Sequence, residues 1–79
     1  MARYRRQRPR KLAGKLRELR LRMGMTQEEL AKHLGTDSGS ISRFETGNRE
    51  PSLLDLLAYS KLAGVTINAL VDDKMKMFK

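Results

Sequence analysis

The side chains that could do covalent or metal chemistry are few and far apart in the sequence. His33 is the only histidine and the chain has no cysteine, so a thiol nucleophile or a cysteine-based zinc site lacks its residues. The acidic pairs Glu28-Glu29 and Asp72-Asp73 are adjacent, and adjacent residues do not converge on one helical face. We therefore expect His33 to face solvent. We predict a protein that is not an enzyme and that uses no metal and no cofactor.

Basic side chains offer a different chemistry, which is the binding of phosphate. Residues 1–11 contain no acidic residue and carry +6 of the total charge of +8, from Arg3, Arg5, Arg6, Arg8, Arg10 and Lys11. Such a segment attracts nucleic acid, because neutralised phosphates release their counterions. Residues 1–10 are predicted to be a disordered basic arm that follows a duplex or enters its minor groove. The alternative is a disordered solubilising tail.

A short helix is predicted between residues 27 and 34. The Thr26 hydroxyl can accept a hydrogen bond from the backbone N–H of Glu29 while the Glu29 side chain reaches back, which is a capping box. An apolar stripe follows at helical spacing, made of Leu30, Ala31 and Leu34. Gly35 comes next, where a chain leaving a helix often turns in the left-handed conformation that glycine adopts most easily.

A second helix is predicted to start directly after this turn. Thr36 and Asp37 can cap it, and Ile41 and Phe44, three residues apart, face inward. The polar residues of the helix are left on another face, namely Ser38, Gly39, Ser42 and Arg43. Two short helices, a glycine turn and a polar outer face together indicate a helix-turn-helix.

This segment resembles the helix-turn-helix of the Cro/CI-type, lambda-repressor-like DNA-binding domains, the XRE family. Gln27 matches the family's first position, Ala31 the small residue between the helices, Gly35 the turn and Ile41 the inward anchor. The flanking stretches LRELRLRMGMTQEEL and ETGNREPSLLDLLAYSKLAGVTINAL look like the family's first helix and its last two. The resemblance covers residues 12 to 71 and implies an all-α fold of five helices.

The resemblance implies which residues contact DNA bases, namely Ser38, Gly39, Ser42 and Arg43. Arg43 is the main candidate, because arginine on guanine is the commonest specific contact and discriminates by about 1–3 kcal/mol. At Gly39 many family members place a long polar side chain. The glycine either lets the backbone approach the groove closely or leaves most of the reading to Ser38 and Arg43. Asp37 either caps this helix or accepts a hydrogen bond from a cytosine amine, and the cap is favoured.

Contacts to phosphate position a protein on DNA without specifying sequence. Gln27 matches the family's phosphate contact, and further candidates lie on the flanking loops and the first helix: Thr36, Asn48, Arg49, Lys15, Arg17 and Arg22. Arg20 matches an arginine that pairs with the glutamate ending the second helix, here Glu45, and the pair would join the two helices. The alternative for Arg20 is a phosphate contact.

Three more helices complete the predicted domain. The first begins at Pro9 and runs to Met23, and its apolar stripe is Leu12, Leu16, Leu19 and Met23. Ser52 and Thr66 cap the last two, whose apolar surfaces come from Leu53, Leu56, Leu57, Tyr59 and Ala63, and from Ile67, Leu70 and Val71. The chain divides into an arm at 1–10, a domain at 11–73 and a tail at 74–79. The tail is expected to fray, or else to join a dimer contact through its apolar residues.

The composition fits one small soluble domain. The absence of cysteine fits a reducing cytoplasm, and no apolar run approaches the roughly 20 residues that cross a bilayer. No signal peptide is recognisable at the amino end. We therefore expect a cytoplasmic protein without membrane contact.

These features predict a small transcriptional regulator that binds double-stranded DNA sequence-specifically at an operator. A homodimer is expected, because one helix reads only a few base pairs and two-fold related half-sites about 34 Å apart extend the site. Its expected face is the last helix together with the tail. Repression is favoured over activation. The alternatives are an antitoxin or mobile-element controller with a protein partner, and an adapter that binds RNA or protein. The lack of aromatic residues placed for base stacking counts against single-stranded RNA.

Overall fold

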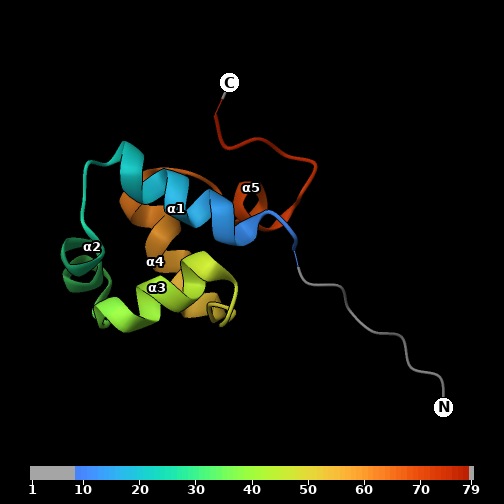
Figure 1. The fold of residues 1–79 in the computed structure, drawn as a ribbon. Coiled ribbons are helices and arrows are strands. Elements are labelled where there is room, and N and C mark those ends of the chain that lie inside the picture. The colour runs from blue at the N-terminus through green and yellow to red at the C-terminus, as the bar shows by residue number, and fades with distance from the viewer. Residues whose placement is uncertain (1–8, 79) are drawn as a thin grey trace, which may run out of the picture.

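The computed structural model describes residues 9–78, which form five α-helices (Figure 1). In chain order these are α1 Leu12–Arg22, α2 Gln27–Leu34, α3 Ser38–Thr46, α4 Leu53–Ala63 and α5 Ile67–Val71. Residues 9–78 contain no strand, and the predicted five-helix, all-α fold is confirmed. None of the helices in this range is both long and apolar enough to span a bilayer.

The helix ends follow the capping residues of the sequence. The Thr26 hydroxyl accepts from the Glu29 backbone N–H at 3.1 Å, and the Glu29 carboxylate accepts from the Thr26 N–H at 2.8 Å. Ser52 and Asp55 form the same reciprocal pair at the start of α4. Gly35 ends α2 with a φ of 72°, in the left-handed region. Only residues 35–37 therefore separate α2 from α3, as a helix-turn-helix requires.

The core lies between the five helices and determines which face of α3 is outward. Its fully buried large side chains are Leu16, Leu19, Leu30, Ile41, Tyr59 and Leu70. Phe44 of α3 meets the ring of Tyr59 of α4 edge to face, with centroids 6.5 Å apart. Because Ile41 and Phe44 are buried in this core, the opposite side of α3 faces away from the protein.

Helix α1 begins later than the sequence predicts. Pro9 is the predicted first residue, but the helix starts at Leu12, and its N-cap residue Lys11 makes no side-chain capping hydrogen bond. The Asp73 carboxylate accepts instead from the backbone N–H groups of Arg10 at 2.9 Å and of Lys11 at 3.0 Å. A residue near the other end of the chain thus takes the place of a local cap.

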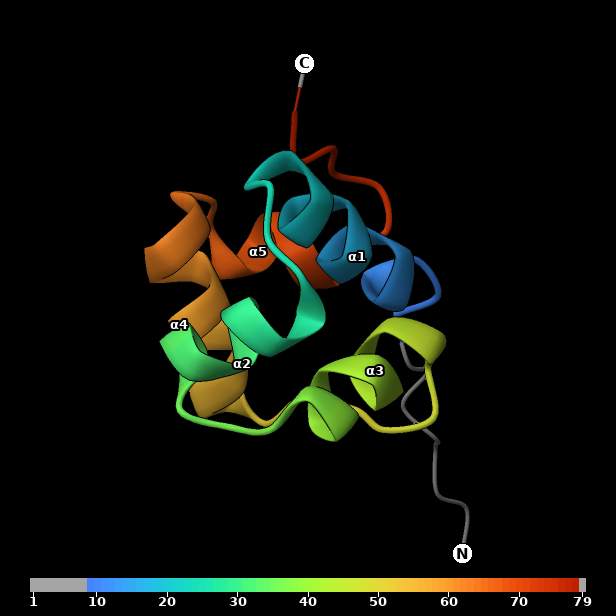
Figure 2. The same cartoon turned by 60° about the vertical axis from the view of Figure 1, so that its left-hand side comes forward.

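Residues 72–78 pack along α1, so the prediction that the tail frays is wrong. The Lys15 ammonium donates to three backbone carbonyls at the end of α5 and in the tail, those of Ala69, Asp72 and Met75. The Arg22 guanidinium lies 3.9 Å from the centroid of the Phe78 ring. The tail lies at the end of the molecule opposite α3 in both views (Figures 1 and 2).

Helix α4 presents apolar side chains to solvent at its amino end. Leu56 and Tyr59 face the core as predicted. The sequence assigns Leu53 and Leu57 to the same apolar surface, but they are 69% and 37% exposed, and Leu54 is 74% exposed. These leucines are therefore free for contact with another molecule.

Candidate nucleic-acid interface

The candidate interface is built on the outer face of α3. Its N-cap is Asp37, whose carboxylate accepts from the Ser40 backbone N–H at 3.2 Å and from the Ser40 hydroxyl at 2.8 Å. Ser40, Ile41 and Phe44 are buried. The four residues predicted to contact bases share the opposite face: Ser38, Gly39, Ser42 and Arg43. Arg43 is exposed and the other three are half-buried, so Arg43 extends furthest into solvent.

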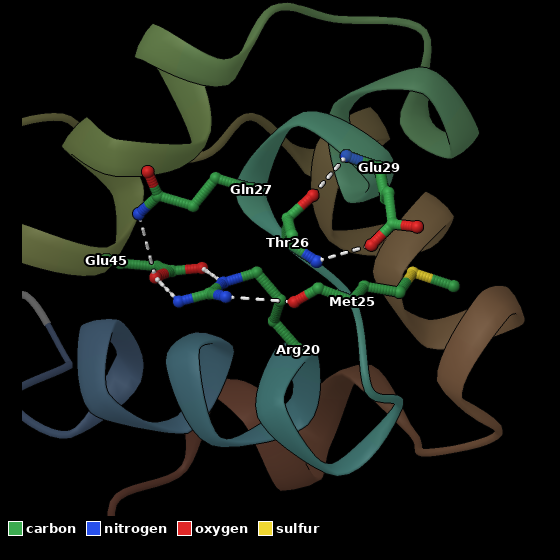
Figure 3. A network of polar contacts seen from close by, with 6 residues as sticks. All are labelled: Arg20, Met25, Thr26, Gln27, Glu29 and Glu45. Carbon is green, nitrogen blue, oxygen red and sulfur yellow. Dashed lines mark hydrogen bonds and ion pairs between the residues drawn. The ribbon is translucent and has the colours of Figure 1, made fainter.

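An ion pair between α1 and α3 fixes the orientation of α3 (Figure 3). Arg20 Nε donates to Glu45 Oε2 at 2.8 Å and Arg20 Nη2 to Glu45 Oε1 at 3.1 Å, in the two-pronged geometry typical of strong arginine–carboxylate pairs. Arg20 Nη1 also donates to the Met25 carbonyl at 2.9 Å. The hydrogen bonds to Glu45 and the charge of Glu45 raise the pKa of the Arg20 guanidinium, against the opposing effect of burial. The Arg20 side chain therefore binds within the protein, which argues against its alternative role as a phosphate contact.

Gln27, at the start of α2, joins the same cluster. Its side-chain Nε2 donates to Glu45 Oε1 at 3.3 Å, so the residue predicted to contact phosphate lies beside the carboxyl end of α3 (Figure 3). The small residue Ala31 is buried within α2, as expected for the position between the two helices.

The loop between α3 and α4 places two more candidates beside α3. Asn48 and Arg49 are both exposed. The Arg49 backbone N–H donates to the Arg43 carbonyl at 3.2 Å, and its Nη1 donates to the Ser40 hydroxyl at 3.4 Å. Arg49 therefore folds back over α3, with its guanidinium 5.9 Å from the centroid of the Phe44 ring.

The predicted phosphate residues of α1 lie on different sides of that helix. Lys15 is only 8% exposed and donates to backbone carbonyls, so its predicted phosphate contact is wrong. Arg22 lies on the same side, against Phe78 and Glu18. Arg17 is exposed and lies one turn from Arg20, on the side of α1 that faces α3. Of the three, only Arg17 extends the surface of α3.

The last two residues of the basic arm, Pro9 and Arg10, lie next to the α3–α4 loop. Pro9 and Arg10 line a small cavity of about 90 Å³ together with Gly47 and Arg49. Arg3, Arg5, Arg6 and Arg8 fall outside the described residues. Thr36, in the turn before α3, is half-buried, and its backbone N–H donates to the Ala31 carbonyl.

A second basic surface lies between α1 and the tail. It is a groove of about 780 Å³ lined by Arg10, Lys11, Arg22, Lys74 and Lys76, together with the acidic Glu18 and Asp73. The groove is on the side of α1 away from α3. His33, on α2, is exposed as predicted. No group of three potential metal-ligating side chains occurs among residues 9–78.

Two residues of these networks have roles that the sequence does not make evident. Ser40 is buried and connects the Asp37 carboxylate to Arg49, and its signal is the Asp37-x-x-Ser40 spacing of a helix N-cap. Asp73 caps α1 from a distance of more than sixty residues in sequence, for which the sequence holds no local signal.

Comparison with known proteins identifies the family. A helix-turn-helix family model matches residues 16–70, which is more than half of the chain and includes α2, α3 and α4. The chain belongs to the Cro/CI-type helix-turn-helix family. It is a transcriptional regulator whose DNA-binding element is the pair α2–α3.

Members of the helix-turn-helix family align over most of this chain. An uncharacterized HTH-type transcriptional regulator of Archaeoglobus fulgidus is 48% identical over 59 residues, which cover 75% of this chain and 79% of that protein. The HTH-type transcriptional activator BcrR of Enterococcus faecalis is 39% identical over 57 residues, which cover 72% of this chain but 28% of BcrR. The crystal structure of the P22 c2 repressor with a synthetic operator superposes with a TM-score of 0.75 at 27% identity, over 80% of this chain and 96% of that chain.

Proposed function

We propose that this chain binds an operator in double-stranded DNA as a homodimer, with α3 of each copy in the major groove. The observation that carries the proposal is the division of α3 into two faces. Ile41 and Phe44 anchor it in the core, while Arg43 and its polar neighbours face outward. An α-helix fits the major groove of B-DNA, where each base pair presents a distinct pattern of donors and acceptors.

Positively charged and polar side chains around α3 are proposed to bind phosphates on both sides of the groove. They are Arg17 of α1, Gln27 of α2, Thr36 of the turn, and Asn48 and Arg49 of the following loop. The basic arm, with Arg3, Arg5, Arg6, Arg8 and Arg10, is proposed to add phosphate contacts beyond them. A chain that begins at Pro9 tests the arm. This shortened chain keeps the hydrogen bond from the Arg10 N–H to Asp73. Loss of the arm should lower the affinity for DNA and make that affinity less dependent on salt concentration.

In the proposed dimer, the two copies contact each other through the leucines at the amino end of α4. Among residues 9–78 the exposed large apolar side chains are Leu21, Leu53, Leu54, Leu57 and Met75, and three of these five lie together on α4. The dimer face predicted from the sequence, α5 with the tail, is less suitable because Met77 and Phe78 pack against the core of the same chain. A substitution Leu54→Glu, at a 74% exposed position, should weaken the dimer in sedimentation velocity while leaving the helical circular dichroism unchanged.

Repression is the proposed outcome of binding, because occupation of an operator that overlaps a promoter is enough to exclude competing proteins. The site of action is proposed to be the cytoplasm, where such an operator would be found. A promoter fused to the selected operator tests the sign of regulation. Expression should fall when the chain is supplied, and a rise would identify an activator.

The proposed operator binding is tested by selecting a random duplex library with the purified chain near 0.2 M salt, since non-specific binding weakens steeply with salt. Enrichment of a two-fold symmetric sequence is the expected result. Arg43→Ala should lose preference at one base pair in each half-site, whereas the control Lys61→Ala, at an exposed position on α4, should select the same sequence as the wild type. Binding without any enriched sequence would overturn the proposal and favour an RNA-binding or protein-binding adapter.

A further inference from the structure

Gly39 lies beneath two charged side chains of the DNA-facing surface. A Cβ atom at this position would be 2.9 Å from Asp37 Oδ2 and 3.7 Å from Arg43 Nη1. Asp37 precedes the glycine by two residues and Arg43 follows it by four, one helical turn further along α3. The carboxylate and the guanidinium thus converge over the space that a side chain at position 39 would fill.

The carboxylate in this arrangement is held in place. Asp37 Oδ1 accepts from the Ser40 hydroxyl at 2.8 Å and Oδ2 accepts from the Ser40 backbone N–H at 3.2 Å, and the same hydroxyl accepts from Arg49. The hydrogen bonds from Ser40 lower the pKa of Asp37 most, and the positive charge of Arg43 lowers it further. The flexible Arg43 side chain therefore faces a negative group whose position is fixed by the backbone of α3.

The backbone conformation does not explain the glycine. Gly39 is not among the glycines with positive φ, which are Gly24, Gly35, Gly47 and Gly64. Glycine inside a helix is less favourable than alanine, so alanine at position 39 would be expected to make α3 more stable. What distinguishes position 39 is its surroundings, because Gly14, also within a helix, has no neighbouring atom within 4 Å of a Cβ. The absence of a side chain at position 39 thus leaves the space that the Asp37 carboxylate occupies, and the Arg43 guanidinium borders the same space at ordinary contact distance.

We propose that Gly39 and Asp37 are positioning residues for Arg43, and that α3 presents Arg43 to a guanine at one fixed position of each half-site. The inference rests on the proposed binding of operator DNA and specifies its main base contact. An arginine loses rotamer freedom when it binds, and a guanidinium that the Asp37 charge attracts toward the space above Gly39 has less to lose. Guanine is the base that fits, because its O6 and N7 accept from both prongs of a guanidinium. Gly39 itself contacts no base through a side chain.

Two competing roles for these residues predict different behaviour. If Gly39 allows the backbone to approach DNA closely, an added methyl group obstructs binding whether or not Arg43 is present. If Asp37 serves only as a cap, asparagine or serine replaces it without effect on DNA, because both are good N-cap residues. The effect of each substitution must therefore be measured with and without Arg43.

The experiment uses the full chain and its variants Gly39→Ala, Asp37→Asn, Asp37→Ser and Arg43→Ala, together with the double variants that combine Arg43→Ala with Gly39→Ala or Asp37→Asn. Each is measured for affinity to the selected duplex and to the same duplex with the guanine of each half-site replaced by adenine. The wild type should prefer guanine by roughly tenfold or more. The variants of Gly39 and Asp37 should lower this preference at least threefold, and should have no further effect on it when Arg43 is absent. Circular dichroism checks that α3 is folded in each variant.

Three results would overturn the inference. The guanine preference could be unchanged in both the Gly39 and the Asp37 variants. It could also fall equally with and without Arg43, which would point to the approach of the backbone or to capping. A wild-type chain without any base preference would overturn the proposed operator binding as well, and this outcome is distinct from the first two.

Discussion

The ion pair of Arg20 and Glu45 should be essential for stability, and a second pair on α1 provides a matched control. The side chains of Arg20 and Glu45 are 11% and 3% exposed. Removing one partner of a buried pair strands the remaining charge and costs about 3–5 kcal/mol. The control is Arg22 with Glu18, at 3.1 Å and with 53% and 49% exposure. An exposed pair four residues apart contributes only about 0.3–0.5 kcal/mol.

The perturbations are Glu45→Gln and Glu18→Gln, which remove the same charge from the two pairs. A domain of this size is stable by about 4–12 kcal/mol, so the loss at Glu45 is a large fraction of the total. With about 4–8 °C of melting temperature per kcal/mol, Glu45→Gln should lower the midpoint by at least about 12 °C. Glu18→Gln should lower it by no more than about 4 °C.

The assay is urea unfolding followed by circular dichroism, supported by thermal melts of the same samples. Glu45→Gln should shift the urea midpoint strongly with an unchanged slope, which reports a change in stability and not in the denatured state. The double variant Arg20→Met with Glu45→Gln should be more stable than Glu45→Gln alone, because it leaves no stranded charge. Equal effects of Glu45→Gln and Glu18→Gln would refute the reasoning.

Three further predictions concern residues outside the proposed DNA-binding surface. Lys15→Met should lower the free energy of unfolding by about 2 kcal/mol, because three backbone carbonyls lose a charged donor. DNA affinity of the folded protein should stay the same, and a clear loss of affinity would restore Lys15 as a phosphate contact. Tyr59→Phe should keep or raise the free energy of unfolding, by up to about 1 kcal/mol, since its buried hydroxyl has no hydrogen-bond partner among the described residues; a marked loss in urea unfolding would reveal a partner. The N–H groups of Lys11 and Arg10 lower the folded-state pKa of Asp73, so its stabilising effect is present above the unfolded pKa and is lost as the pH falls through the folded pKa. The stability difference between wild type and Asp73→Asn should therefore shrink from pH 6 toward the folded-state pKa of Asp73, and a difference independent of pH would exclude this role.

Features that depend on neighbouring residues could be predicted from the sequence. The capping box of Thr26 and Glu29 and the turn at Gly35 involve residues at most a few positions apart, and they determine where α2 begins and ends. The apolar spacing of Ile41 and Phe44 likewise determines which side of α3 is buried. The separation of α3 into a core face and an outer face is therefore available without a structure.

Features that depend on distant residues could not be predicted in the same way. Lys15 lies three residues after Leu12, at the spacing of the core-facing stripe, but its charge suggests solvent exposure. Only the packing of the tail places three carbonyls around its ammonium group. Asp73 has the sequence context of a helix-terminus charge, yet it caps α1 from the far end of the chain. The pairing of Arg20 with Glu45, which are also far apart in the sequence, could be predicted only from the family resemblance. The position of Arg43 over Gly39 depends on a side-chain conformation, which sequence spacing does not specify.

The claim that α3 reads the DNA is tested most directly by NMR on the ¹⁵N-labelled chain, titrated with the selected duplex. Binding through α3 should shift the amide signals of Ser38, Ser42 and Arg43 most, together with those of the loop at Asn48 and Arg49. The signals of Lys74 and Lys76, in the basic groove on the far side of α1, should stay in place. Shifts concentrated in the groove between α1 and the tail, with α3 unaffected, would contradict the claim.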